Sequence, residues 1–167
     1  MKLEMEEWLA RPEVRDVVGV PVSMDVSPSE DPYDNNVSCF ISFERATPEN
    51  DWVQKYIMFH IKSLPGCCGV MVIHSLNSTD VSQKTVNTIM NGVLEIIRNK
   101  ARTGEWGKMV LCTTIRPQKN FIKWLQHAKF TPGPKSRNPR TGQTITTWTK
   151  DLTLPKPKRT PSQEFVS

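Results

Sequence analysis

A short polar segment, residues 74–80, lies between two apolar stretches and holds the residue types that could do chemistry. Residues 69–73, just before it, form a short β-branched apolar run that is typical of a buried strand. A helix is predicted after it, with Asp80 or Ser82 as the N-cap, because either side chain can accept from first-turn amides. Those amides attract anions, and this corner of an α/β protein often binds ligands. His74 could act there as a general base, since its ordinary pKa lies near neutrality; a structural histidine at the strand end is the alternative.

The helix after this segment is predicted from its periodicity. Apolar residues recur at helical spacing from residue 86 to residue 97, which places them on one stripe. The six residues of this stripe are Val86, Ile89, Met90, Val93, Leu94 and Ile97. Three strands are expected before the helix, at residues 36–45, 54–62 and 69–73. Alternation over the second strand predicts that Ile57, Phe59 and Ile61 share one face.

The beginning of the chain adds two helices and a loop. Residues 3–18 are predicted to be helical with a break near Arg11 and Pro12, because the missing N–H of proline costs nothing in the first turn of a second helix. The apolar face of these helices is expected to contain Trp8, Leu9, Val14, Val17 and Val18. Residues 21–36 are rich in turn formers and predict a loop with at most a short strand at 22–24.

After the central helix the pattern predicts a strand, a helix and a closing pair of strands. Residues 108–115 form an apolar run, and residues 118–129 form an amphipathic helix with Trp124 at the edge of its stripe. The closing pair starts at Phe130 and ends with the alternating strand 144–149. A long loop is expected within this pair, marked by Pro132, Gly133, Pro134, Pro139 and Gly142. The whole order predicts an α/β fold with a mixed central sheet of about six or seven strands flanked by helices.

A single domain is expected over residues 1–152, followed by a basic, proline-rich flexible tail at residues 153–167. No apolar run approaches the roughly 20 residues that span a bilayer, so no membrane partner is expected. The acidic start lacks the apolar centre of a signal peptide, which predicts a cytoplasmic protein or one in a particle assembled there. The four cysteines form no C-x-x-C pair and the histidines lack zinc-ligand spacing, so free thiols and no metal are expected.

The charge is divided unevenly along the chain. Residues 1–96 carry 7 basic and 14 acidic side chains, whereas residues 97–167 carry 15 basic and 3 acidic ones. A basic half favours nucleic acid, a phosphate-rich ligand or an acidic protein surface as partner, although an ordinary solvated face would look the same. The candidate contact residues are Lys119, Lys123, Lys129, Lys135, Arg137, Arg140, Lys156, Lys158 and Arg159. Trp124 and Trp148 could stack on bases.

One stretch of the chain carries a family resemblance. Residues 120–130, N-F-I-K-W-L-Q-H-A-K-F, are similar to the helix of the GNAT acyltransferase superfamily that begins near an asparagine and ends just before Gly-Phe. The succession of elements over residues 36–152 resembles the same superfamily, and residues 138–143 suit its closing hairpin. The chain looks closest to short, degenerate members among the internal virion proteins of tailed phages. The resemblance implies a GNAT-like fold, an acyl-CoA corner, and a location in the host cytoplasm or the virion.

The departures from the family pattern bear on activity. The family's coenzyme motif is Arg or Gln, two residues, Gly, one residue, then Gly or Ala, and the resemblance places it from Gln83 onward. Val86 and Thr88 stand at its small positions, where we expect their branched side chains to obstruct a diphosphate. The family's tyrosine, a general acid for the departing thiolate, falls near Leu125, which cannot donate a proton. Lys129 replaces the glycine of Gly-Phe, and the buried strand lacks a glutamate base.

Three functions follow as hypotheses. The first is a GNAT-like protein that has lost acyl transfer and acts as a binding or assembly module, with a protein partner and no cofactor. The second is an active N-acetyltransferase that uses acetyl-CoA, with His74 as the base. The residues that would hold the coenzyme are Ile73, Ser75, Leu76, Ser82, Gln83, Lys84 and Asn120. The third is a nucleic-acid-binding protein that uses the basic half, which is also a mode open to the first.

Overall fold

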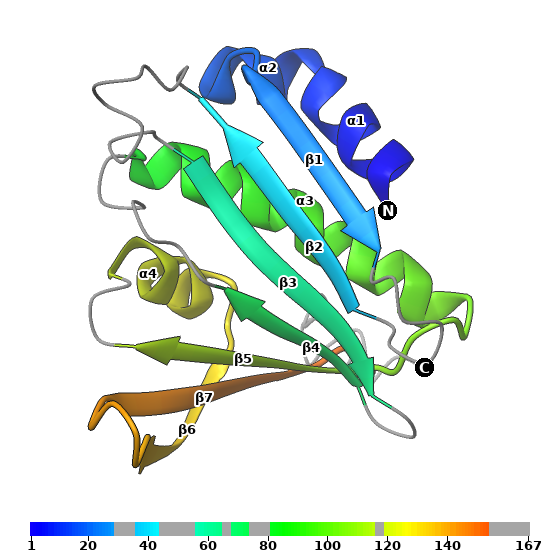
Figure 1. The fold of residues 1–167 in the computed structure, drawn as a ribbon. Helices are drawn as coiled ribbons and strands as arrows, with labels where there is room; N and C mark the ends of the chain where they lie inside the picture. The colour runs from blue at the N-terminus through cyan, green and yellow to red at the C-terminus, as the bar shows by residue number, and fades with distance from the viewer. Residues whose placement is uncertain (29–35, 44–55, 65–67, 74–80, 116–118, 154–167) are drawn as a thin grey trace, which may run out of the picture.

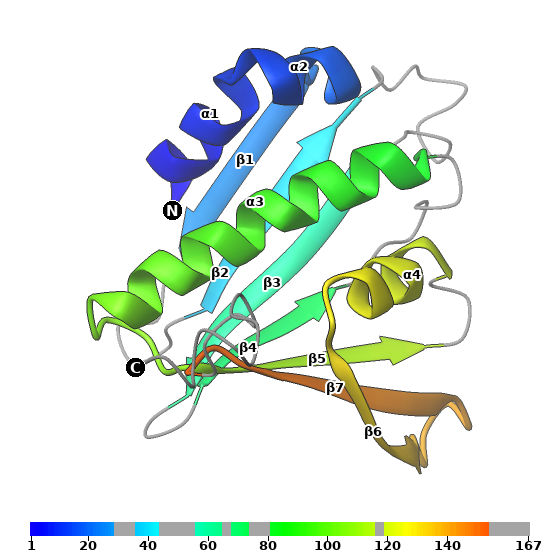
Figure 2. The same ribbon diagram turned by 180° about the vertical axis from the view of Figure 1, so that it is seen from behind.

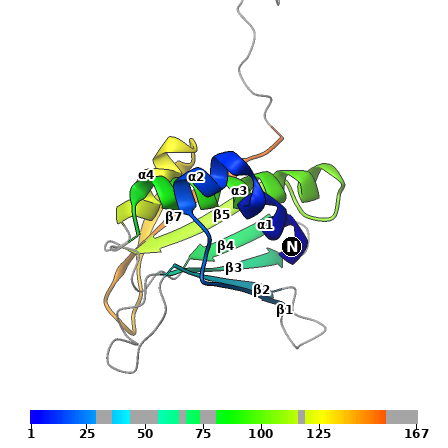
Figure 3. The same ribbon diagram turned by 90° about the horizontal axis from the view of Figure 1, so that it is seen from above.

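The structure of the protein is a computed structural model that describes residues 1–28, 36–43, 56–64, 68–73, 81–115 and 119–153. Seven strands form one sheet, and the four helices lie together on one of its faces (Figures 1 and 3). The helices are α1 (Lys2–Ala10), α2 (Pro12–Val18), α3 (Gln83–Arg102) and α4 (Lys119–His127). The strands are β1 (Ser23–Pro28), β2 (Asn36–Ser42), β3 (Tyr56–Leu64), β4 (Cys68–Ile73), β5 (Met109–Ile115), β6 (Thr131–Arg137) and β7 (Thr144–Asp151).

The sheet is mixed, and its strand order is β1-β2-β3-β4-β5-β7-β6. β4 and β5 run parallel, with Cys68 opposite Met109 and Val72 opposite Thr113, whereas each other pair of neighbours is antiparallel. Parallel strands need a crossover connection, which α3 supplies between β4 and β5. β7 returns between β5 and β6 and completes the sheet. The predicted α/β class with helices flanking a mixed sheet is confirmed.

Helix α3 is the main contact between the helices and the sheet. All six residues of its predicted stripe are buried, and the most exposed of them, Leu94, has an exposed fraction of 6%. They join the alternating strand residues Ile57, Phe59 and Ile61 in one hydrophobic core. The periodicity therefore predicted both buried faces correctly, because burial on a helix or a strand repeats with the period of the element.

Helices α1 and α2 have the predicted break between them. Pro12 occupies the first turn of α2, and Gly19 ends α2 with a φ of 75°. Val14 is buried, but Val17 is 42% exposed, so its predicted place on the apolar face is wrong. α2 has only seven residues, and within it Val14 is the one buried residue.

Two strands differ from the expectations. β1 extends to Pro28 and pairs with β2 from Ser23 to Pro28, where only a short strand within a loop was expected. β6 runs through Pro132 and Pro134, which had been expected in a loop. β6 is an edge strand, where proline removes no ladder hydrogen bond, and its register shifts between Pro132 and Lys135. Turn-forming residues therefore did not separate a loop from an irregular edge strand.

None of the described helices is long and apolar enough to cross a membrane. The tail predicted at residues 153–167 lies outside the described residues except for Thr153. Cys39 and Cys112 are buried free thiols, as expected, and burial raises the pKa of Cys39 to about 12 with a smaller contribution from Asp25. The side chains of Cys67 and Cys68 lie outside the described part of the structure.

Candidate functional site

The candidate site lies where β4 and β5 end beside the N-terminus of α3. The parallel ladder between β4 and β5 stops at the pair Val72 and Thr113. Ile73, the last residue of β4, pairs with Phe59 of β3, while β5 continues to Ile115 beside β7. Among the described strands, the carboxyl end of β5 therefore pairs with β7 on one side and has no partner strand on the side of β4.

Ser82 is the N-cap of α3, one of the two predicted capping residues. Its Oγ accepts from the Thr85 amide at 3.2 Å and donates to the Thr85 Oγ1 at 2.9 Å. The amide of Val86 already donates to the Ser82 carbonyl at 3.0 Å. The first-turn amides left without an acceptor among the described residues are those of Gln83 and Lys84, and the side chain of Lys84 is exposed beside them. This end of α3 can therefore receive one small anionic group.

Gln83 and Asn120 join the two helices at this corner. The Gln83 Nε2 donates to the Asn120 carbonyl at 2.8 Å and to the Asn87 Oδ1 at 2.8 Å. The Asn120 Nδ2 in turn donates to the Val81 carbonyl at 2.9 Å. The structure thus brings together two predicted coenzyme residues that are 37 positions apart in the chain, and it connects them to each other. The Gln83 Oε1 is buried and lacks a hydrogen-bond partner among the described residues.

The obstruction expected at Val86 is wrong. Val86 is 4% exposed and belongs to the hydrophobic core, so its branched side chain faces away from the mouth of the first turn. Thr88 lies more than one turn into α3, where its carbonyl accepts from the Trp8 Nε1 at 3.0 Å. Bulk at these two positions therefore does not decide whether an anion can approach the helix end.

Trp124 is fully buried, which corrects its predicted place at the edge of the α4 stripe. Its ring stacks on Phe121 and contacts Phe130, and its Nε1 donates to the Asn91 Oδ1 at 2.9 Å. Trp148 is 6% exposed, and its Nε1 donates to the Thr114 Oγ1 at 3.0 Å. The predicted stacking role is therefore wrong for Trp124, and the accessible part of Trp148 lines a cavity instead of the outer surface.

The end of α4 carries two of the departures from the GNAT pattern. Leu125, near which the sequence resemblance places the family's tyrosine, is fully buried and has no proton to donate. Lys129 has a φ of 65°, in the left-handed region that favours glycine. The Phe130 amide donates to the Leu125 carbonyl at 3.0 Å, and the Lys129 amide donates to the Gln126 carbonyl at 3.2 Å. These two bonds form a Schellman motif, whose left-handed residue is usually glycine.

Helix α4 and the β6–β7 hairpin lie side by side at one end of the molecule (Figure 2), and both carry exposed basic residues. All the described candidates are exposed: Lys119, Lys123, Lys129, Lys135, Arg137 and Arg140. None of them pairs with a carboxylate within the described residues. We call these six residues the basic face.

Several predicted site residues fall outside the described part of the chain. These are His74, Ser75, Leu76, Lys156, Lys158 and Arg159. Ile73 is described through its backbone alone, as the last residue of β4. Within the part of the chain that the structure describes, no three His, Cys, Asp or Glu side chains converge as a metal site.

No protein-family model and no curated protein matches the chain. Solved acetyltransferase structures do match its fold. The ribosomal-protein-S5-alanine acetyltransferase from Vibrio fischeri superposes with a TM-score of 0.50 and 10% identity, over 73% of this chain and 64% of that enzyme. The chain therefore shares its fold with a solved acetyltransferase. It spans less than two thirds of the Vibrio enzyme, whose activity and substrate are therefore not transferred to it by this likeness.

Other acetyltransferase structures resemble the chain at lower TM-scores. An N-acetyltransferase from Staphylococcus aureus Mu50 gives a TM-score of 0.45 at 11% identity, over 92% of this chain and 95% of that one. A RimL ribosomal L7/L12 α-N-protein acetyltransferase, solved in complex with coenzyme A, gives 0.47 at 10% identity, over 70% and 62%. The mixed sheet and its helices are consistent with the GNAT-like fold expected from the sequence resemblance, and the match to the Vibrio enzyme agrees with it.

Proposed function

We propose that this GNAT-fold protein has lost acyl transfer and acts as a binding or assembly module. The proposal rests on Leu125, which is fully buried and near which the sequence resemblance places the family's general acid. A leucine cannot protonate a departing thiolate, and a fully buried position cannot be reached by the reacting groups. The sequence resemblance supplies the setting, a phage particle or accessory complex with a protein partner.

The fit of acetyl-CoA to the described residues supports the same proposal. One small anion suits the free amides of Gln83 and Lys84, but the next amide, that of Thr85, is already engaged by the Ser82 hydroxyl. The side-chain NH2 groups of Gln83 and Asn120 are engaged in hydrogen bonds at the corner where α3 meets α4. The described residues therefore do not fit the coenzyme, and no catalytic step is assigned to them.

Calorimetry with acetyl-CoA and coenzyme A tests this proposal directly. We expect no saturable binding up to about 1 mM, the concentration that corresponds to roughly 4 kcal/mol of binding free energy. In an assay with acetyl-CoA and mixed amine acceptors, the wild-type protein and His74→Ala should give the same background rate. Micromolar binding, together with turnover that His74→Ala abolishes, would instead establish the active N-acetyltransferase.

The basic face favours a second candidate, which is also a binding mode of such a module. Its six cations lack carboxylate partners among the described residues, so they remain available to a polyanion. Nucleic-acid phosphates contacted by these side chains would release counterions on binding. We therefore propose a polyanionic partner, either nucleic acid or an acidic protein surface.

Fluorescence anisotropy with labelled single- and double-stranded DNA tests the polyanion mode. Binding should weaken steeply between about 50 and 200 mM salt. The triple variant Lys119→Gln, Lys123→Gln, Lys135→Gln should weaken it further and reduce the salt slope by about 3. A matched double variant on the opposite half, Lys2→Gln and Arg15→Gln, should leave both quantities unchanged. Salt-independent retention on DNA would contradict contacts to phosphate.

A further inference from the structure

A cavity of about 570 Å³ lies between α4, the end of β5 and the β6–β7 hairpin. Its lining residues are Thr114, Ile122, Pro132, Lys135, Thr144, Thr146 and Trp148. These described lining residues come from α4, β5, β6 and β7, and none of them belongs to α3. The volume of the cavity is that of a small-molecule pocket, which typically measures roughly 300–1,000 Å³.

The irregularity in β6 shapes the outer wall of this cavity. Pro132 pairs with Trp148 and Lys135 with Thr146, so β6 contains one more residue than β7 over this stretch. A bulge of this kind bends the strand and re-aims the side chains beside it. Both residues that flank the bulge, Pro132 and Lys135, line the cavity. Gly133 fits within the bulge because a Cβ there would lie 2.8 Å from the Thr147 carbonyl oxygen.

The floor of the cavity contains a buried hydroxyl with unused donor capacity. Thr114 is 2% exposed, and its Oγ1 accepts from the Trp148 Nε1 at 3.0 Å. The hydroxyl proton of Thr114 has no acceptor within the described residues. A buried donor without an acceptor is costly, so the cavity favours contents that present an acceptor to Thr114.

The chemistry of the remaining lining is divided. Ile122, Pro132 and the indole of Trp148 offer apolar surface, whereas Thr144 and Thr146 offer hydroxyl groups. Lys135 is the one charged residue of the lining, and it pairs with no carboxylate among the residues that the structure describes. An anion with an apolar body would pack on the apolar surface, accept hydrogen bonds from the hydroxyl groups and pair with Lys135.

We propose that this cavity is a binding site for a small amphipathic carboxylate, aliphatic or aromatic. Its apolar body packs on Ile122 and the Trp148 ring. Its carboxylate accepts hydrogen bonds from Lys135 at the mouth and from the threonine hydroxyls, including the otherwise unused donor of Thr114. This site does not depend on the proposed loss of acyl transfer, because it uses none of the residues at the α3 corner.

Proton–nitrogen correlation NMR of the full chain tests the site, with phenylacetate and hexanoate as probes and phenylethanol and hexanol as uncharged controls. The indole signal of Trp148, assigned by its loss in Trp148→Phe, should shift saturably with both carboxylates. The alcohols should bind about tenfold more weakly, since a hydrogen bond to a charged group contributes roughly 1.4 kcal/mol or more. Lys135→Met should cause the same loss for the carboxylates and leave alcohol binding unchanged.

Two further variants complete the test. Lys123→Met removes a charge of the basic face outside the cavity and should leave the carboxylate affinity unchanged. Thr114→Val keeps the side-chain shape and should weaken carboxylate binding several-fold. If Thr114→Val does not fold, the result for Lys135→Met decides. Equal affinity for carboxylates and alcohols, an unaffected Lys135→Met, or no Trp148 shift up to about 10 mM probe would each overturn the proposal.

Discussion

Helix α3 is held by a tryptophan on each side, and the two sides are built differently. On the α1 side, the Trp8 ring lies directly on Gly92, and its Nε1 donates to the Thr88 carbonyl at 3.0 Å. On the α4 side, the fully buried Trp124 donates to the side chain of Asn91 at 2.9 Å. On the α1 side the tryptophan ring approaches the backbone of α3 closely, whereas on the α4 side the tryptophan forms a hydrogen bond with a side chain of α3.

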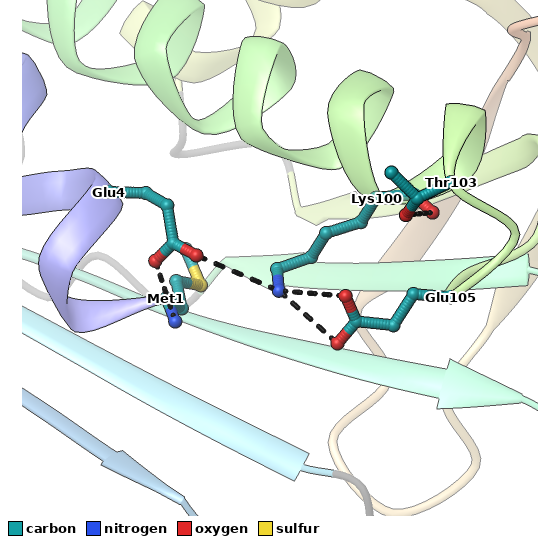
Figure 4. Close-up of polar contacts among 5 residues, drawn as sticks. All are labelled: Met1, Glu4, Lys100, Thr103 and Glu105. Atoms are coloured by element: carbon teal, nitrogen blue, oxygen red, sulfur yellow. Dashed lines mark hydrogen bonds and ion pairs between the residues drawn. The ribbon is translucent and has the colours of Figure 1, made fainter.

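The surrounding polar contacts follow the same division. The α1 side has ion pairs: Arg11 lies 3.5 Å from Glu95, and Lys100 lies between Glu4, at 3.9 Å, and Glu105, at 3.3 Å (Figure 4). The α4 side has the amide contacts of Gln83 and Asn120 described above. Partly exposed ion pairs contribute little to stability, whereas directional hydrogen bonds that are partly shielded from water fix one geometry. Helix α1 is therefore held by shape, and α4 is held by bonds that position the candidate site.

The largest expected effect comes from removing the buried tryptophan. Trp124→Ala should lower the free energy of unfolding by about 3–5 kcal/mol, because it leaves a cavity among Phe121 and Phe130. Trp8→Ala should cost at least about 1 kcal/mol less, since Trp8 is only half-buried. Urea unfolding of the two variants measures both values. An equal loss at the two positions would contradict the difference between the sides.

Gly92→Ala tests the close approach on the α1 side. A Cβ at Gly92 would lie 2.4 Å from the Trp8 Nε1, so the ring must move, and we expect a loss of about 1–3 kcal/mol in the free energy of unfolding. In a Trp8→Ala background, the same substitution should instead stabilise α3 by roughly 1 kcal/mol through helix propensity. A loss of equal size in both backgrounds would show that Trp8 is not the cause.

Lys129→Gly tests a weakness at the end of α4. Lys129 has a φ of 65°, whereas the corresponding end of α2 carries Gly19 at 75°. We expect Lys129→Gly to raise the free energy of unfolding by about 1 kcal/mol, because glycine adopts this conformation without steric cost. Lys129→Ala, which removes the same side chain but keeps the Cβ, should give no such gain. If both variants gain equally, the side chain and not the backbone is responsible.

The fold could be predicted from the sequence wherever burial follows a local period. The stripe on α3 and the alternation of Ile57, Phe59 and Ile61 are of this kind, since each residue's environment depends on its own element. Trp124 was misplaced because its burial depends on α3, and its partner Asn91 lies 33 positions away. Pro132 was expected in a loop because the residues around it do not indicate that its strand lies at the edge of a sheet, where proline is tolerated.

The candidate site was predicted only in part, for a related reason. Capping is local, so the sequence narrowed the cap of α3 to Asp80 or Ser82, and the structure has Ser82. The contact between Gln83 and Asn120 joins residues that are 37 positions apart, and neither residue type marks the other in the sequence. No sequence pattern predicts the cavity beside α4 either, because it forms where a bulge in β6 meets α4 and β5. Contacts between elements depend on the finished fold, and a single sequence carries them weakly.

The smallest expected effect concerns the ion pairs of the α1 side. A hydrogen bond from the Met1 amino group, 2.8 Å away, lowers the pKa of Glu4, with a smaller contribution from Lys100. Because the folded-state pKa is depressed, the stabilisation is present in full above the unfolded pKa of Glu4 and is lost as the pH falls through its folded pKa. Glu4→Gln should therefore be less stable than the wild type at neutral pH, and the difference should vanish in acid. Its size should be small, because the Glu4 side chain is 43% exposed to solvent.

Urea unfolding of the wild type and Glu4→Gln across this pH range, at low and high salt, measures the difference. Glu7→Gln, on the same helix, is the matched control, since Glu7 forms no ion pair within the described residues and should show no such pH dependence. High salt should reduce the Glu4→Gln difference by screening, whereas it should not reduce the loss in Trp124→Ala. A Glu4→Gln difference that persists in acid would mean that Glu4 acts through packing, and the α1 side would then depend on shape alone.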